Sequence, residues 1–177
     1  MKISDITKIS VCTALLCVSG MLAIPVPFSH TALTLQVFAV ILTAIILSPK
    51  KAFFAVLAYL LIGFIGVPVF SGMTGGFQCL FTVSGGFLVS FIVAVPLVSA
   101  CKGIRLATHI VSAVFVGIPV IYVISTLYNM LVIGFSSVAE TLTVTLPFLP
   151  FDIVKSVAAG VIGHCINRTL SRAGINV

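Results

Sequence analysis

Long runs of apolar residues constrain this chain more than any other feature of its sequence. Six runs can be placed, at about residues 6–24, 33–48, 52–67, 80–101, 107–133 and 149–170. Hydrophobic residues make up 60% of the sequence and charged residues 7%, with a mean hydropathy of +1.36. A water-soluble domain of this composition would aggregate. The composition therefore predicts an integral membrane protein.

The apolar runs are continuous and do not alternate with polar residues, which favours helices over a β-barrel. A helix needs roughly 20 residues to cross about 30 Å of hydrocarbon. The 177 residues therefore accommodate five or six spans and little else. We predict an all-α integral membrane protein with six transmembrane helices in a single membrane domain, residues 1–177. The second and third runs are short for a complete span.

Basic residues occupy the breaks between alternate runs. Because positive residues flank membrane helices on the cytoplasmic side, we expect both termini to be cytoplasmic. Their distribution in ones and twos does not form the basic stripe of a nucleic-acid-binding protein, so no nucleic-acid partner is expected. The eight basic residues that follow this rule are Lys2, Lys8, Lys50, Lys51, Lys102, Arg105, Arg168 and Arg172.

The ninth basic residue, Lys155, does not follow this rule. It stands one helical turn after Asp152 in "LPFLPFDIVK" (146–155), near the outer end of the sixth run. Residues three apart share a helical face, and ionisable groups in a membrane span tend to mark binding sites or ion pathways. An acid at a helix start that pairs with the next turn is also common. The residues by themselves leave both interpretations open.

Other polar features have structural as well as functional interpretations. The glycines after the third run allow a close approach of either another helix or a ligand. A small-x-x-x-small pair in the first run, Ser10 and Ala14, permits packing inside the bundle or against a partner. The cysteines and histidines lack metal-site spacing, so no metal is expected. The glycines are Gly72, Gly75, Gly76, Gly85 and Gly86.

Four segments resemble, in order and spacing, the signature segments of the BioY family. The resemblance extends from about residue 6 to residue 172. It implies the S-component fold of energy-coupling factor (ECF) transporters, located in the prokaryotic cytoplasmic membrane and binding biotin near the outer face without a cofactor. It also implies a transmembrane coupling protein and two ABC ATPases as partners. The segments are "IPVPFSHTALTLQ" (24–36), "LIGFIGVPVFSGMTGG" (61–76), "SGGF" (84–87) and "LPFLPFDIVK" (146–155).

The resemblance also assigns roles to residues. Asp152 and Lys155 would recognise the ureido ring of biotin, while Ser10 and Ala14 would contact the coupling protein. The sequence departs from the family pattern at His30-Thr31-Ala32, where many relatives are proline-rich, and at Ser10, where alanine is usual. The further candidate ligand contacts are Gln36, Phe70, Gly72, Thr74, Gly75, Gly76, Tyr128 and Asn129.

Three other functions remain as alternatives. An intramembrane serine protease would need Ser71 or Ser84 at the depth of His109 or His164, and we expect these groups on opposite sides. A stand-alone secondary transporter would need membrane acids for coupling, and only Asp152 qualifies. An S component for a different vitamin would share the fold, but the Asp152-x-x-Lys155 motif points to biotin.

Overall fold

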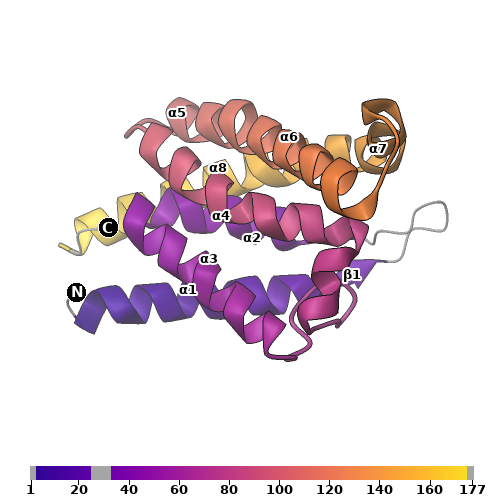
Figure 1. Cartoon of the computed structure of the whole chain (residues 1–177). Helices are drawn as coiled ribbons and strands as arrows, with labels where there is room; N and C mark the ends of the chain where they lie inside the picture. The colour runs from indigo at the N-terminus through magenta and orange to yellow at the C-terminus, as the bar shows by residue number, and fades with distance from the viewer. Residues whose placement is uncertain (1–2, 25–32, 175–177) are drawn as a thin grey trace.

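In the described part of the chain, six helical rods pack side by side, and successive rods run in opposite directions (Figure 1). The computed structural model describes residues 3–24 and 33–174. Helices η1 and η4 are 3-10 helices, and η2 and η3 are π-helical. The elements are α1 (Ile3–Met21), β1 (Ala23–Ile24), β2 (Leu33–Thr34), α2 (Gln36–Ile46), α3 (Pro49–Phe64), η1 (Phe77–Phe81), α4 (Val83–Cys101), α5 (Leu106–Val111), η2 (Ser112–Gly117), α6 (Ile118–Tyr128), η3 (Asn129–Ile133), α7 (Val138–Thr145), η4 (Leu146–Phe148) and α8 (Leu149–Arg172).

The described residues form the six predicted helical rods, and the second and third are short, as the sequence indicated. Helix α2 has 11 residues and α3 has 16, which corresponds to about 16 Å and about 24 Å. Nearly every residue of α2 is buried, so the longer rods shield it and it need not span the hydrocarbon. Four rods among the described residues are long and apolar enough to cross a membrane: Ile3–Met21, Val83–Cys101, Leu106–Ile133 and Val138–Arg172.

The alternating rods give the bundle two chemically different ends. We call one the terminal end: it contains the start of α1, the α2–α3 and α4–α5 turns, and the last turns of α8 (Figure 1). We call the other the hairpin end: it contains the β1–β2 hairpin, residues 65–82 and α7. Lys155 lies toward the hairpin end. The basic residues at or near the terminal end are Lys8, Lys50, Lys51, Lys102, Arg105, Arg168 and Arg172, while Lys2 lies outside the described residues.

Several helices begin or end at residues other than those predicted, for local reasons. The expected second helix, 33–48, starts only at Gln36, because Leu33 and Thr34 pair with β1. The expected third helix, 52–67, lies at 49–64, because Pro49 fits the first turn of a helix and Gly66 has a φ of +112° beyond its end. The outer-loop segment around His30 lies outside the described residues.

The segment 134–148, between the fifth and sixth predicted runs, contains a helix, α7. Ser137 Oγ accepts a hydrogen bond from the Glu140 backbone N–H at 3.2 Å, and Glu140 Oε2 accepts one from the Ser136 N–H at 2.8 Å. This arrangement resembles a capping box and satisfies backbone donors at the helix start. The carboxylate of Glu140 therefore has a structural partner.

Lys102 closes the terminal end of α2. Its ammonium donates hydrogen bonds to the carbonyls of Ala44, Ile45 and Leu47, at 3.1, 2.7 and 2.5 Å. The last carbonyls of a helix lack partners within it, and a cation there also complements the helix dipole. Burial, and secondarily the charge of Lys51, lower the pKa of Lys102 to about 8.

This lowered pKa predicts a pH-dependent stability. The unfolded chain has a lysine pKa of about 10.4, so between about pH 8 and that value the native state binds fewer protons than the unfolded state. The contribution of Lys102 to the free energy of unfolding therefore rises with pH across this window. The Tm of the wild type minus the Tm of Lys102→Met, measured by thermal scanning in detergent, should increase as the pH rises through this range.

Lys50→Met is the matched control, because Lys50 is exposed at the same end. Its Tm curve should run parallel to that of the wild type. A wild-type minus Lys102→Met difference that stays constant from pH 8 upward would contradict the assigned pKa.

Candidate ligand-binding site

The first turns of α8 carry a buried ion pair. Pro150 lies in the first turn, where its missing N–H costs no hydrogen bond. Lys155 Nζ lies 3.0 Å from Asp152 Oδ1, and the two side chains are only 13% and 4% exposed. Removing one partner would leave an uncompensated buried charge, which is strongly destabilising.

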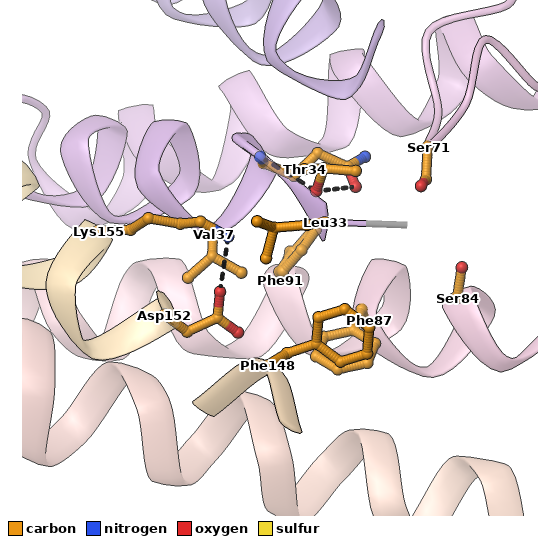
Figure 2. A pocket seen from close by; sticks show the side chains of 11 residues that line it. Leu33, Thr34, Val37, Ser71, Ser84, Phe87, Phe91, Phe148, Asp152 and Lys155 are labelled. Carbon is orange, nitrogen blue, oxygen red and sulfur yellow. Dashed lines mark hydrogen bonds and ion pairs between the residues drawn. The ribbon is translucent and has the colours of Figure 1, made fainter. Parts of the chain in front are cut away.

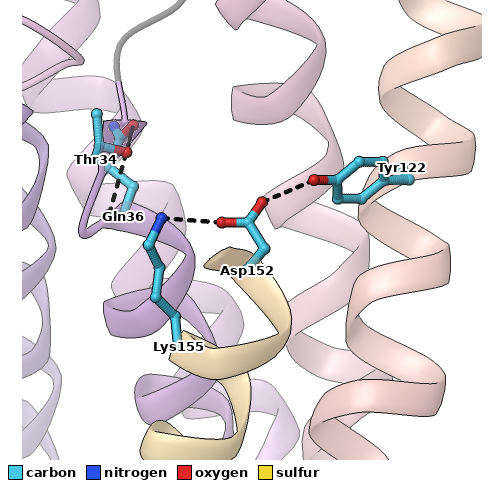
Figure 3. Close-up of polar contacts among 5 residues, drawn as sticks. All are labelled: Thr34, Gln36, Tyr122, Asp152 and Lys155. Carbon is cyan, nitrogen blue, oxygen red and sulfur yellow. Dashed lines mark hydrogen bonds and ion pairs between the residues drawn. The ribbon is translucent and has the colours of Figure 1, made fainter. Parts of the chain in front are cut away.

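Tyr122, from the middle of α6, holds the second oxygen of the same carboxylate. Its hydroxyl donates to Asp152 Oδ2 at 2.9 Å (Figure 3). A carboxylate offers about four lone-pair positions and an ammonium three N–H groups. These contacts occupy two lone pairs of Asp152 and one N–H of Lys155. The pair can therefore still accept and donate hydrogen bonds to a ligand.

A cavity of about 40 Å³ adjoins this pair. Three aromatic rings form part of its wall, with Phe87 and Phe91 from α4 and Phe148 from η4 (Figure 2). Such rings supply apolar area that suits a flat, largely apolar ligand. The other lining residues are Leu33, Thr34, Gln36, Val37, Ser71, Ser84, Asp152 and Lys155.

A second cavity of about 340 Å³ adjoins the first at the hairpin end. The two share Gln36, Ser71 and Ser84 as lining residues, and Figure 2 shows the two serine hydroxyls on opposite sides of the space between them. The second volume falls in the range of small-molecule pockets, about 300–1,000 Å³. The remaining lining residues are Phe70, Thr74, Gly75, Gln78, Cys79, Thr82 and Leu88.

The glycine-rich loop folds back on itself above the second cavity. Phe70 and Thr74 form an isolated antiparallel bridge, and Thr74 Oγ1 donates to the Ser71 carbonyl at 2.9 Å. Left-handed conformations occur at Gly72, with φ +71°, and at Met73, with φ +60°. Glycine accommodates this conformation without strain, whereas a non-glycine residue adopts it at a cost.

Phe70 anchors this loop to α3. Its ring is 1% exposed and packs edge-on against Tyr59 and Phe64, with ring centroids 5.5 and 5.4 Å away. The ring also occupies the space that a Cβ on Gly63 would fill. Phe70 lines the second cavity, but most of its surface contacts protein, so its main role is core packing.

Gln36, at the first turn of α2, connects the hairpin to the core. Its amide Nε2 donates to the Tyr59 hydroxyl. Its Oε1 accepts from Thr34 Oγ1 at 3.2 Å, and Figure 3 shows these two side chains next to each other. Both amide atoms of Gln36 are thus already paired. The side chain lines both cavities and holds their shared wall in place.

The predicted site residues divide into two groups. The structure brings six of them into the linings of the two cavities: Asp152, Lys155, Gln36, Phe70, Thr74 and Gly75. The linings do not include the other four: Gly72, Gly76, Tyr128 and Asn129. Tyr128 donates to the Leu80 carbonyl at 3.0 Å, and Asn129 is fully buried beside Gly86.

Ser10 and Ala14 are exposed on the outer face of α1. The sequence left open whether this pair packs inside the bundle or outside it. The neighbouring side chains Val11 and Val18 are also exposed, at 64% and 54%. The pair therefore faces the surroundings of the bundle, where lipid or another protein can contact it.

Some site residues were not predicted from the sequence. Tyr122 lies 30 residues before Asp152 inside an apolar run, and Phe148 stands among many other phenylalanines. Their positions in the site depend on how α6 and η4 pack against α8. Ser84 had a signal, since it begins the "SGGF" segment.

Apolar helices that enclose an ion pair beside a cavity define a membrane protein suited to binding a small molecule. The BioY family model matches residues 1–172. The biotin transporter BioY2 of Lactococcus lactis subsp. cremoris is 37% identical, over 96% of this chain and 93% of its own length. The probable biotin transporter BioY of Pyrococcus horikoshii is 34% identical, over 93% and 96%. The chain belongs to the BioY family.

A solved structure has the same fold. It is the crystal structure of the S-component for biotin from an ECF-type ABC transporter, which superposes with a TM-score of 0.84 at 21% identity. The match covers 94% of this chain and 92% of that one. The predicted all-α fold of the S-component type is confirmed.

The contact between Tyr122 and Asp152 yields a stability prediction. Tyr122→Phe removes a hydrogen bond to a buried carboxylate, and such a bond contributes about 1.5–3 kcal/mol. The variant should have a lower Tm than the wild type in detergent. Tyr128→Phe is the matched control, because its hydroxyl meets a neutral carbonyl and the expected loss is about 0.5–1.5 kcal/mol. Equal losses in both variants would contradict the special role of Tyr122.

Proposed function

We propose that this chain captures biotin at the hairpin end for uptake across the membrane. The observation that carries the proposal is the buried Asp152–Lys155 pair, held by Tyr122 beside an aromatic wall. The ureido ring of biotin has two N–H donors and one carbonyl acceptor. Asp152 accepts from an N–H group and Lys155 donates to the carbonyl, so the pair and the ring are complementary.

The rest of biotin matches the two cavities. The thiophane ring packs against Phe87, Phe91 and Phe148 in the first cavity. The valerate tail extends into the second cavity, under Thr74 and Gly75. Because the first cavity holds only about 40 Å³, the loop 65–76 moves outward when the ring system enters. The loop thus acts as a lid or wall over the ligand.

The charge distribution supports one orientation in the membrane. The basic residues gather at the terminal end, and the positive-inside rule assigns such an end to the cytoplasm. Both termini are then cytoplasmic, and the biotin site at the hairpin end faces outward. The membrane is the cytoplasmic membrane of a prokaryote.

Uptake requires partners that hydrolyse ATP. We infer that this chain is the S component of an ECF transporter, working with a transmembrane coupling protein and two ABC ATPases. The chain itself binds biotin and catalyses no reaction. The exposed Ser10 and Ala14 on α1 give the coupling protein a surface that a helix can approach closely.

The geometry disfavours the alternatives. A serine protease needs its serine and histidine in contact, but Ser71 and Ser84 line cavities at the hairpin end, whereas His109 and His164 line one at the terminal end. A proton-coupled carrier needs a free membrane acid. Glu140 caps α7, and Asp152 already has two partners.

The ion pair gives the main test of the proposal. Asp152→Asn and Lys155→Ala should each weaken biotin binding at least tenfold, or about 1.4 kcal/mol, because each removes a charge-assisted hydrogen bond. The measurement is equilibrium binding of labelled biotin to the purified chain, with thiamine and riboflavin as competitors. Glu140→Gln, at the other acid of the hairpin end, should retain wild-type affinity.

Two results would overturn parts of this assignment. Wild-type affinity for biotin in both variants would show that the ion pair does not contact the ligand. Displacement of biotin by thiamine or riboflavin, or no biotin binding by folded protein, would overturn the assignment of biotin as the ligand. Biotin uptake by cells that express this chain but lack every ECF module would support the alternative of a stand-alone transporter.

The partner surface has a separate test. Ser10→Leu together with Ala14→Leu places two bulky side chains on the outer face of α1, which prevents close helix contact. Co-purification with co-expressed coupling protein and ATPases should fall at least tenfold, while biotin affinity stays unchanged. Ala107→Leu, at an exposed position of α5, is the control. Normal co-purification of the double variant would show that the coupling protein binds another surface of the chain.

A further inference from the structure

A cavity of about 530 Å³ lies at the terminal end of the bundle, at the opposite end of α2 from the candidate biotin site. It is formed by the end of α2, the α4–α5 turn and the last turns of α8. The biotin proposal assigns it no role. Its lining residues are Ile46, Lys102, Gly103, Ile104, His109, His164, Asn167, Arg168, Ser171 and Arg172.

In the described part of the chain, the lining carries positive side chains and no acidic side chain. Arg168 and Arg172 are four residues apart on α8, so both project from the same face, and Lys102 adds a third cation. The sequence contains three acidic residues. Asp5 pairs with Lys51 at 2.8 Å, while Glu140 and Asp152 belong to the hairpin end.

The lining also contains polar atoms without partners in the described part of the chain. The rings of His109 and His164 meet edge to face, with centroids 5.2 Å apart, and Nδ1 of each is buried and unpaired. His109 Nε2 lies 2.7 Å from the Gly103 carbonyl. A carbonyl only accepts, so Nε2 carries the proton and Nδ1 of the neutral ring is an acceptor.

Asn167 completes this set. Its Nδ2 donates to the Ile45 carbonyl at 2.9 Å, which fixes the orientation of the amide. Its Oδ1 is buried and has no partner among the described residues. Buried polar atoms are rarely left unpaired in native proteins. The cavity therefore combines cations with unpaired acceptors, which a hydrogen-bond donor from water or from a ligand would satisfy.

We propose that this cavity binds the phosphate ester of a polyol, such as the headgroup of phosphatidylglycerol. The phosphate lies against Arg168 and Arg172, whose guanidinium groups match its oxygens. The hydroxyl groups of the polyol donate to Asn167 Oδ1 and His109 Nδ1. Lys102, already bonded to three carbonyls, contributes its charge to the field.

The position of the cavity favours a lipid as the source of this phosphate. It opens at the helix ends, where headgroups lie, and basic pockets between membrane helices bind such groups. Ile46 and Ile104 line the same cavity, and Ile104 is 93% exposed. These two side chains offer apolar contact to the glycerol backbone and the first acyl carbons.

The test measures the Tm of the full-length chain in a neutral detergent, because a ligand that binds only the native state raises the Tm. One arm adds phosphatidylglycerol to the micelles, with phosphatidylcholine as the reference lipid. The other adds soluble glycerol 3-phosphate, with sodium chloride at matched ionic strength. A saturable rise in the first arm identifies a lipid headgroup, and one confined to the second identifies a soluble polyol phosphate.

Variants connect the effect to the cavity. Arg168→Gln with Arg172→Gln should raise the half-saturating concentration at least tenfold. Lys50→Gln with Arg105→Gln removes the same charge from the same end, outside the lining, and should respond like the wild type. Ser171→Asp adds a negative charge at an exposed lining position and should likewise raise the half-saturating concentration at least tenfold. It provides the test if the double arginine variant does not fold.

Two outcomes would overturn the proposal. One is a wild-type Tm that neither ligand raises above its reference. The other is an equal weakening of the ligand-induced rise in Tm in the Arg168/Arg172 and Lys50/Arg105 variants, which would show a general effect of surface charge. Neither outcome depends on biotin, so this test and the biotin test fail independently.

Discussion

The shortness of helix α2 is the constraint on which the rest of the structure depends. Its 11 residues extend about 16 Å, roughly half of a membrane's hydrocarbon, yet it lies buried among longer rods. Space therefore remains at both of its ends. Its first residue, Gln36, lines the two cavities of the hairpin end. Its last residue, Ile46, lines the cavity of the terminal end.

The few charges of the chain are divided between these two ends. At the hairpin end, Asp152 and Lys155 neutralise each other within a largely apolar wall, so the pair stays buried yet retains hydrogen-bonding capacity. At the terminal end, Lys102 is satisfied by the carbonyls of Ala44, Ile45 and Leu47, while Arg168 and Arg172 have no acidic partner among the residues that the structure describes. A balanced pair suits a ligand with donors and acceptors, and an unbalanced cluster suits an anion.

Local sequence patterns predicted what depends on neighbouring residues. The apolar runs identified the helices, and the i, i+3 spacing of Asp152 and Lys155 identified the ion pair. The same patterns overlooked the capping of α7 by Ser137 and Glu140, although an S-x-x-E motif was present. They also overestimated α2, because hydropathy does not distinguish a helix buried by protein from one that spans lipid.

The sequence by itself determined that this protein lies in a membrane, is helical and carries one ionisable pair away from its basic turns. Those properties follow from transfer free energies and helical spacing, which are local. The tertiary structure decided that Tyr122 meets Asp152, that Phe148 closes the aromatic wall, and that His109 and His164 touch. Each of these contacts joins residues at least 30 positions apart on different helices, so only the packing of the rods brings them together.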